Sequence, residues 1–196
     1  MFENIICMYV TLMPPIIAGI LNMIWCKLPI LTKLKTPIDF GKNFVDGKRV
    51  FGDNKTYKGF VGYILLNVIM ALLWGILCEF SNLGKFNLLY VNNENTNMFN
   101  LIIGILLGLG YSLFELPNSF LKRRLDVEPG KTVSGVKKIF FIFLDQADSV
   151  LGCTLVVAMF YKMSLTFYIM YVLLGSATHF ILNMLLYFMK LRKNMF

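Results

Sequence analysis

Charged residues are scarce in this chain of 196 residues. Asp, Glu, Lys and Arg make up 15% of it and hydrophobic residues 57%, whereas a soluble domain carries about 25% charged residues. This shortage excludes an ordinary soluble domain and predicts a polytopic membrane protein. The formal net charge of +8 does not predict a nucleic-acid partner, because the basic residues gather between and after the apolar stretches.

Histidine and cysteine, the usual soft metal ligands and covalent nucleophiles, are also rare. The chain has one histidine, His179, and four cysteines without CxxC spacing. The cysteines lie in or beside apolar stretches, so we expect them to pack as small apolar side chains. A single histidine is more often a buried hydrogen-bonding group than a ligand, and the role of His179 stays open. Chemistry that depends on a catalytic His or Cys is therefore not predicted.

Long apolar stretches are abundant, and each is long enough to span a bilayer, which takes about 20 apolar residues. We predict an all-α fold of about five transmembrane helices in a single integral-membrane domain, residues 1–196. Pro14-Pro15 predicts a kink or break in the first helix. The spans are expected near Ile5–Leu28, Gly59–Phe80, Met98–Leu116, Ile139–Tyr161 and Leu165–Met189.

The basic residues predict the orientation in the membrane. Of the 19 Lys and Arg residues, all but Lys85 and Lys162 lie in three regions: 27–58, 122–138 and beyond 189. Because basic loops stay cytoplasmic, we expect the N-terminus outside and the C-terminus in the cytoplasm, which agrees with an odd number of spans. The chain is then a multi-pass protein of the cell membrane, with cytoplasmic loops at about 29–58 and 117–138.

Two acids stand in the fourth apolar stretch, within the run Leu144-Asp145-Gln146-Ala147-Asp148. A carboxylate in hydrocarbon is costly and usually marks a functional site. Spacing of three places Asp145 and Asp148 on one face of a helix, and paired carboxylates suit Mg²⁺ together with water and substrate phosphates. Pairing with a neighbouring cation and proton transfer are the alternatives. Glu115, at the inner end of the third stretch, either joins this site or lies in the interface.

The first cytoplasmic loop has turn signals at Asp46-Gly47 and Gly52-Asp53-Asn54. Lys55-Thr56 then stands at the entry to the second helix. Backbone N–H groups at a helix start favour an anion, and a lysine adds a full charge. For this pair we favour phosphate contact, with helix capping as the alternative for Thr56. Lys33, Lys35 and Lys42 are equally well explained as anchors to anionic headgroups.

The second cytoplasmic loop opens with Pro117-Asn118-Ser119-Phe120-Leu121-Lys122-Arg123-Arg124. Its serine and following cations suit phosphate binding by forked and point donors. An ordinary basic cluster that ends a transmembrane span is the alternative. Pro129-Gly130 predicts a turn that returns the chain towards the paired aspartates.

These motifs together resemble a known family. Ser119-Phe120-Leu121-Lys122-Arg123 followed by Asp145-Gln146-Ala147-Asp148-Ser149 is similar to the signature of the phosphatidate cytidylyltransferases. The small size, the five spans and the first-loop run 46–59 resemble the CDP-archaeol synthase branch. The likeness covers about residues 37–152. The bacterial and eukaryotic diacyl enzymes have a Lys-Asp and a Gly-rich stretch before the paired Asp, where this chain has residues 132–139 instead.

The resemblance implies that CTP and a lipid phosphate give a CDP-lipid and pyrophosphate, with Mg²⁺ as cofactor. In this scheme Asp145 and Asp148 are catalytic and hold the metal, and Lys122 is catalytic through its charge. A lipid phosphate is already anionic at neutral pH, since its second pKa is about 6, so no strong base is required. The substrate-binding residues are then Asn54, Lys55, Thr56, Ser119, Arg123 and Lys131.

Other functions remain open at this point. A CTP-dependent polyprenol kinase would use related residues, and a small transporter would use the aspartates as an ion site. A CDP-alcohol phosphotransferase is disfavoured because its longer Asp-Gly pattern is missing. The lipid tail, ether or ester, is not visible in the sequence. Gly104, Gly108 and Gly110 predict close helix contact, within the chain or in a homodimer.

Overall fold

The computed structural model describes residues 2–131, 133 and 135–190, and these residues form helices, turns and loops without a strand. This part of the chain has five helices long and apolar enough to cross a membrane. The predicted all-α fold with five spans is thus confirmed. The basic residues Arg192 and Lys193 of the predicted C-terminal cluster lie outside the described residues. The spanning helices are α1 (Phe2–Lys27), α2 (Tyr57–Phe80), α3 (Asn97–Arg124), α4 (Lys138–Phe160) and α5 (Leu165–Phe188).

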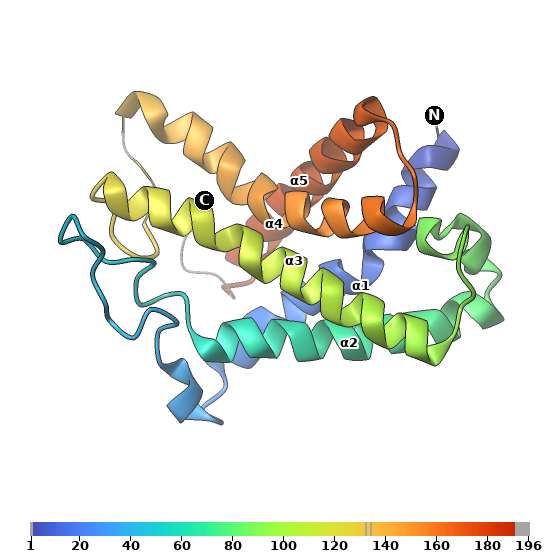
Figure 1. Ribbon diagram of the computed structural model, residues 1–196, viewed down its shortest axis with the longest axis horizontal. Helices are drawn as coiled ribbons and strands as arrows, with labels where there is room; N and C mark the ends of the chain where they lie inside the picture. The colour runs from blue at the N-terminus through green and yellow to red at the C-terminus, as the bar shows by residue number, and fades with distance from the viewer. Residues whose placement is uncertain (1, 132, 134, 191–196) are drawn as a thin grey trace.

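The connections between the helices gather at two ends of the molecule (Figure 1). Segments 28–56, 125–131 and 135–137 lie at one end, and the N-terminus lies at the other with the connection 81–96. The end of α5 returns to the end of α1, where the Lys27 Nζ atom is 3.5 Å from the Lys190 carbonyl oxygen. Both predicted cytoplasmic loops therefore share one end of the bundle. Single-turn 3-10 helices interrupt the connections: η1 (Thr32–Lys35), η2 (Leu83–Phe86), η3 (Leu88–Tyr90) and η4 (Gly135–Lys137).

Of the kink or break predicted at Pro14-Pro15, a break is not found, because α1 is one helix from Phe2 to Lys27; a kink there stays a prediction. A proline has no N–H, so Pro14 leaves the Val10 carbonyl without its usual helical donor. The indole nitrogen of Trp74 in α2 donates to this carbonyl at 2.8 Å. A neighbouring helix thus satisfies the backbone group that the proline frees, as membrane-spanning helices require.

The third helix is longer than the predicted span. It continues from Leu116 through Pro117 to Arg124, so the Ser-Phe-Leu-Lys-Arg run lies on a helix instead of in a loop. Helical spacing then places Glu115, Ser119 and Lys122 on one face. The linear motif is converted into a single row of polar side chains.

Glycines set the spacing of the central helices. A Cβ at Gly104 would lie 2.6 Å from the Cα of Val68, and one at Gly108 would lie 2.8 Å from the Cα of Ile64, so α2 and α3 are in backbone contact. Gly110 and Gly152 allow the same backbone contact between α3 and α4. A Cβ on Gly152 would lie 2.1 Å from the Gly110 carbonyl oxygen. The close contacts predicted from these glycines form within the chain, and the homodimer stays a prediction.

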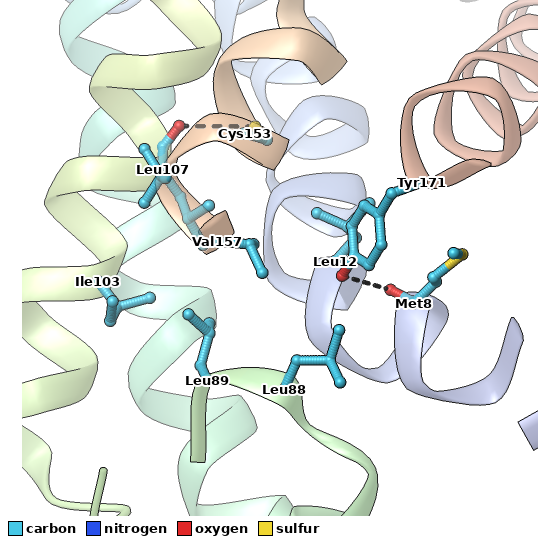
Figure 2. Packing of buried hydrophobic residues seen from close by; sticks show 10 residues of the cluster. Met8, Leu12, Leu88, Leu89, Ile103, Leu107, Cys153, Val157 and Tyr171 are labelled. Atoms are coloured by element: carbon cyan, nitrogen blue, oxygen red, sulfur yellow. Dashed lines mark hydrogen bonds between the residues drawn. The ribbon is translucent and has the colours of Figure 1, made fainter. Parts of the chain in front are cut away.

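The apolar core packs α1, α3, α4 and α5 around the 3-10 turn η3 (Figure 2). Tyr171 donates to the Met8 carbonyl at 3.2 Å, and the Cys153 thiol lies 3.7 Å from the Leu107 carbonyl. Cys153 thus packs as a small side chain, as expected, and all four cysteines are free. The core is formed by Met8, Leu12, Leu88, Leu89, Ile103, Leu107, Cys153, Val156, Val157 and Tyr171.

Candidate active site

A cavity of about 570 Å³ lies between α1, α3, α4, α5 and both loops at the shared end of the bundle. Its two parts differ in chemistry. Residues from α1 and α5 make one part mainly apolar, namely Leu12, Pro15, Ile16, Gly19, Ile20, Met23, Gly175, Leu182 and Leu186, and α5 also contributes the polar His179 and Asn183. The loops, α3 and α4 make the other part polar, through Asn54, Lys55, Glu115, Asn118, Ser119, Lys122, Arg123, Lys131, Asp145 and Asp148.

The two aspartates of α4 converge on one amide from α3. The Asn118 Nδ2 atom donates to an oxygen of Asp145 at 2.7 Å and to an oxygen of Asp148 at 2.7 Å. The Lys122 ammonium, one turn further along α3, is 2.5 Å from both oxygens of Asp145. Asp148 is buried, and its other oxygen is 2.6 Å from the backbone nitrogen of Ser149. The close approach of α3 and α4 at Gly152, one turn after Asp148, makes these short contacts possible.

A second ion pair lines the polar part of the cavity. The Lys55 ammonium, at the end of the first loop, pairs with the Glu115 carboxylate on α3. Burial lowers the pKa of Lys55, but Glu115, Asp148 and Asp145 together raise it by more, so that the pKa lies above its ordinary value and the lysine stays charged. Glu115, whose role was open, is therefore part of the site.

The guanidinium of Arg123 is the most weakly satisfied cation of the cavity. The residue is buried, yet its Nε and Nη1 atoms have no hydrogen-bond partner within the described part of the chain. Buried donors without partners are costly, and here they belong to a planar group suited to phosphate. A Cβ at Gly52 would lie 3.5 Å from Nη1 and 2.8 Å from the Pro129 ring, so the two loops meet beside this arginine.

The first loop is anchored by a buried carboxylate. Asp39 accepts hydrogen bonds from the backbone N–H groups of Gly41, Phe51 and Gly52, at 3.0, 2.9 and 2.9 Å, and from Arg49 at 2.8 Å. Burial raises the pKa of Asp39, but these donors lower it by more, so that it lies well below its ordinary range. The charged carboxylate thereby fixes the loop that carries Asn54 and Lys55.

Nearly all of the residues predicted for substrate and metal binding line this one cavity. Thr56 is the exception: it is the N-cap of α2, and its hydroxyl accepts from the Gly59 N–H at 3.2 Å. The structure thus shows its capping role. Ser119 lines the cavity but donates to the Glu115 carbonyl at 3.1 Å. Lys131 also lines it, and is paired with Glu128 at 2.6 Å in an exposed position.

The basic cluster at the end of α3 is divided between two tasks. Lys122 and Arg123 face the cavity, whereas Arg124 pairs with Asp46 at 2.7 Å and lies over the rings of Phe44 and Phe120. The third cation therefore holds the first loop against α3. Sequence spacing could not separate these tasks, because the three residues are consecutive.

Sequence reasoning assigned no role to Asn118, Asp39 or the α4–α5 contact. Asn183 of α5 donates to the Gln146 side chain at 2.6 Å, and a His179 ring nitrogen lies 3.3 Å from the Gln146 carbonyl oxygen. Helical spacing could have indicated a site role for Asn118, since this residue stands four positions before Lys122. The histidine thus contacts the turn that carries both aspartates.

The donor set fits a magnesium ion that is completed by substrate. No group of three or more His, Cys, Asp and Glu side chains able to hold a metal is found among the described residues, so a closed protein-only site is not formed there. Two carboxylates beside an anion-binding cavity match the way Mg²⁺ is held by one or two carboxylates, water and substrate phosphates. The Asn118 Nδ2 atom contacts both carboxylates, while its Oδ1 atom is buried without a hydrogen-bond partner in the described structure.

Comparison with known proteins places the chain in a family. The family model of CDP-archaeol synthase matches residues 4–196. The CDP-archaeol synthase of Archaeoglobus fulgidus is 38% identical over 133 residues, covering 64% of this chain and 71% of that protein. The CDP-archaeol synthase of Pyrobaculum islandicum is 34% identical over 161 residues, covering 82% of both.

A solved structure described as an intramembrane enzyme for archaeal membrane lipid biosynthesis has the same fold. Its TM-score is 0.61 at 22% sequence identity, and the match covers 90% of this chain and 92% of that one. The chain belongs to the CDP-archaeol synthase family and is a cytidylyltransferase of the membrane, as its sequence motifs predict.

Proposed function

We propose that this chain transfers the cytidylyl group of CTP to an ether-linked, archaetidic acid-like lipid phosphate on the cytoplasmic side of the membrane. A phosphate oxygen of the lipid attacks the α-phosphorus of CTP. The bond from that phosphorus to the bridging oxygen of the β-phosphate breaks, and pyrophosphate leaves. The product is a CDP-lipid.

The single observation that carries this proposal is the two-part cavity. Its polar part holds the paired aspartates and several cations, and its apolar part lies between α1 and α5. The polar part suits a nucleotide and the headgroup of a lipid phosphate, and the apolar part suits hydrocarbon chains. The cavity therefore offers adjoining places for both substrates of the reaction.

The residues position the substrates and neutralise charge. The attacking phosphate is already anionic, so the difficulty is to bring two anions together. Lys55, Lys122 and Arg123 are placed to bind phosphate oxygens, with Asn54 and Ser119 as neutral donors. Holding the two reacting groups in line and supplying fixed positive charge are the two largest effects available to such a site.

The metal ion of this scheme is Mg²⁺. Asp145 and Asp148 would hold it, and Asn118 would position their carboxylates. When bound, the ion supplies positive charge to the phosphate oxygens and a template for their orientation. The donor types, and the two short contacts from Asn118 that already bring the carboxylates together, support this assignment.

Incubation of the purified full chain with α-labelled CTP, Mg²⁺ and matched ether and ester lipid phosphates tests the function. Labelled CDP-lipid with release of pyrophosphate is expected, with the ether substrate preferred. Labelled CDP in place of CDP-lipid would indicate a γ-phosphoryl transfer, and neither product with any lipid would contradict the enzyme reading. Asp145→Asn and Asp148→Asn should each abolish turnover while the protein still folds.

A further inference from the structure

Two of the cations that the proposed function needs for phosphate are held by carboxylates of the chain itself. Lys122 contacts both oxygens of Asp145 at 2.5 Å, and Lys55 pairs with Glu115. These four side chains are shielded from water, since their exposed fractions range from 12% for Lys122 to 26% for Glu115. Ion pairs in such surroundings are screened weakly, so they compete effectively with any other anion for the same lysines.

The charges lining the cavity nearly cancel. The cations are Lys55, Lys122, Arg123 and Lys131, and the anions are Glu115, Asp145 and Asp148. Lys131 is in turn paired with Glu128 at the cavity edge. A triphosphate without a metal ion therefore meets a site of almost no net charge, in which the two lysines already have partners.

We infer that Asp145 and Glu115 act as internal competitors for the phosphate-binding lysines, and that the competition by Asp145 makes the site select the metal-bound form of CTP over free CTP. This inference rests on the proposed function and adds a selection mechanism to it. The Asp145 carboxylate can pair with Lys122 or bind the metal ion. If Asp145 binds the metal ion, Lys122 would lose its carboxylate partner, and its ammonium would be available to bind the phosphates.

The exchange makes the binding of metal and nucleotide cooperative. A metal ion that occupies Asp145 raises the affinity for CTP by freeing Lys122, and CTP that takes Lys122 raises the affinity for the metal by the same factor. Glu115 limits Lys55 in the same way, but it is not a proposed metal ligand. Its ion pair should therefore weaken CTP binding with and without the metal.

The test measures CTP dissociation constants by titration calorimetry on the purified full chain, once in EDTA and once in excess MgCl₂. In EDTA we expect Asp145→Asn to bind CTP roughly 10-fold tighter than the wild type, because a freed lysine gains a charge-assisted bond to phosphate. Added Mg²⁺ should strengthen CTP binding strongly in the wild type and little in Asp145→Asn. Glu115→Gln should also bind tighter in EDTA, but keep the response to Mg²⁺.

Asp126→Asn is the matched control. It removes one carboxylate from the chain, but Asp126 is exposed and pairs with Lys48 away from the cavity. Its CTP affinity in EDTA should equal that of the wild type, which separates the local effect from a change in overall charge. A melting curve checks that each variant is folded. Should Asp145→Asn fail to fold, Glu115→Gln still decides whether a carboxylate competes for a lysine, and the ratio of wild-type CTP affinities in MgCl₂ and in EDTA decides whether the metal-bound form is selected.

The outcomes separate this inference from the proposed function. If Asp145→Asn and Glu115→Gln are folded and bind metal-free CTP no tighter than the wild type, the competition does not exist, while the enzyme reading stands on its turnover assay. If the wild type binds no CTP even with Mg²⁺, the proposed function itself is overturned.

Discussion

The backbone contact between Gly110 and Gly152 gives the sharpest prediction, because it joins the packing of two helices to the geometry of the site. A Cβ added at Gly152 would lie 2.1 Å from the Gly110 carbonyl oxygen, 2.6 Å from its carbon and 2.9 Å from the Phe114 ring. The nearest atoms are backbone, so a rotamer change cannot relieve them. Gly152→Ala should therefore push α4 away from α3.

The magnitude follows from these distances. To turn a 2.1 Å approach into an ordinary contact of 3.4 Å, the helices must open by about 1.3 Å at Gly152. Asp148 stands one turn before it and Asn118 across the gap, joined at 2.7 Å; the same opening would stretch this bond beyond hydrogen-bond range. Misplacement of reacting groups by 1 Å costs roughly 100-fold in rate, and overpacking costs about 1–3 kcal/mol of stability.

Steady-state kinetics of CDP-lipid formation measure the effect. We expect kcat of Gly152→Ala to fall by roughly 100-fold, with the protein still inserted and folded by its melting curve. Gly59→Ala is the matched control, because a Cβ there meets only ordinary contacts at 3.6 Å in the first turn of α2. Phe114→Leu should not rescue Gly152→Ala, because it leaves the backbone clash in place.

A folded Gly152→Ala enzyme with near-normal kcat would refute this reasoning. It would mean that the site tolerates a wider α3–α4 spacing, and that the contacts of Asn118 with the aspartates do not control turnover. A similar loss in Gly59→Ala would point instead to a general effect of alanine on the fold.

Three further predictions test individual contacts. Asn118→Ala removes the donor shared by Asp145 and Asp148, and kcat/KM should fall by roughly 30-fold because two charge-assisted hydrogen bonds are lost; an unchanged value would rule out a positioning role. Asp39→Asn should destabilise the folded first loop by about 2 kcal/mol. A protease should then cleave the loop faster at neutral pH than in the wild type, and the cleavage rate should lose the pH dependence that Asp39 gives it. In the wild type, the lowered pKa of Asp39 means that its contribution is complete above the unfolded value of about 4 and disappears as the pH falls through the folded value. Thr56→Ala should cost about 1 kcal/mol in stability through the lost cap while leaving the KM for CTP unchanged, and a raised KM would restore Thr56 as a phosphate contact.

Much of the architecture could be predicted from local sequence features. Apolar stretches of sufficient length are spans whatever their neighbours, so five spanning helices were predicted and five are found among the described residues. The ends of the helices were predicted less accurately. Helix α3 continues past Leu116 to Arg124, because basic residues beyond the hydrocarbon can extend a helix into water, where hydropathy no longer marks it. The break expected at Pro14-Pro15 failed because Trp74, distant in sequence, supplies the missing donor to Val10.

The sequence by itself determined the class of protein, the family and the chemical inventory of the site. Scarce charge, apolar length and the spacing of Asp145 and Asp148 are properties of the chain, and they need no partner to be recognised. Nearly every residue predicted for the site lines one cavity, since motifs at the same ends of neighbouring helices must meet.

Only the tertiary structure decided what each side chain does there. It made Thr56 a helix cap, turned Arg124 towards the first loop, and placed Asn118 between the two aspartates. It also paired Lys122 with Asp145. These outcomes depend on how far α4 approaches α3 and on how each helix is rotated about its axis. That geometry is set by glycine contacts between distant segments, and the local sequence does not specify which segments meet.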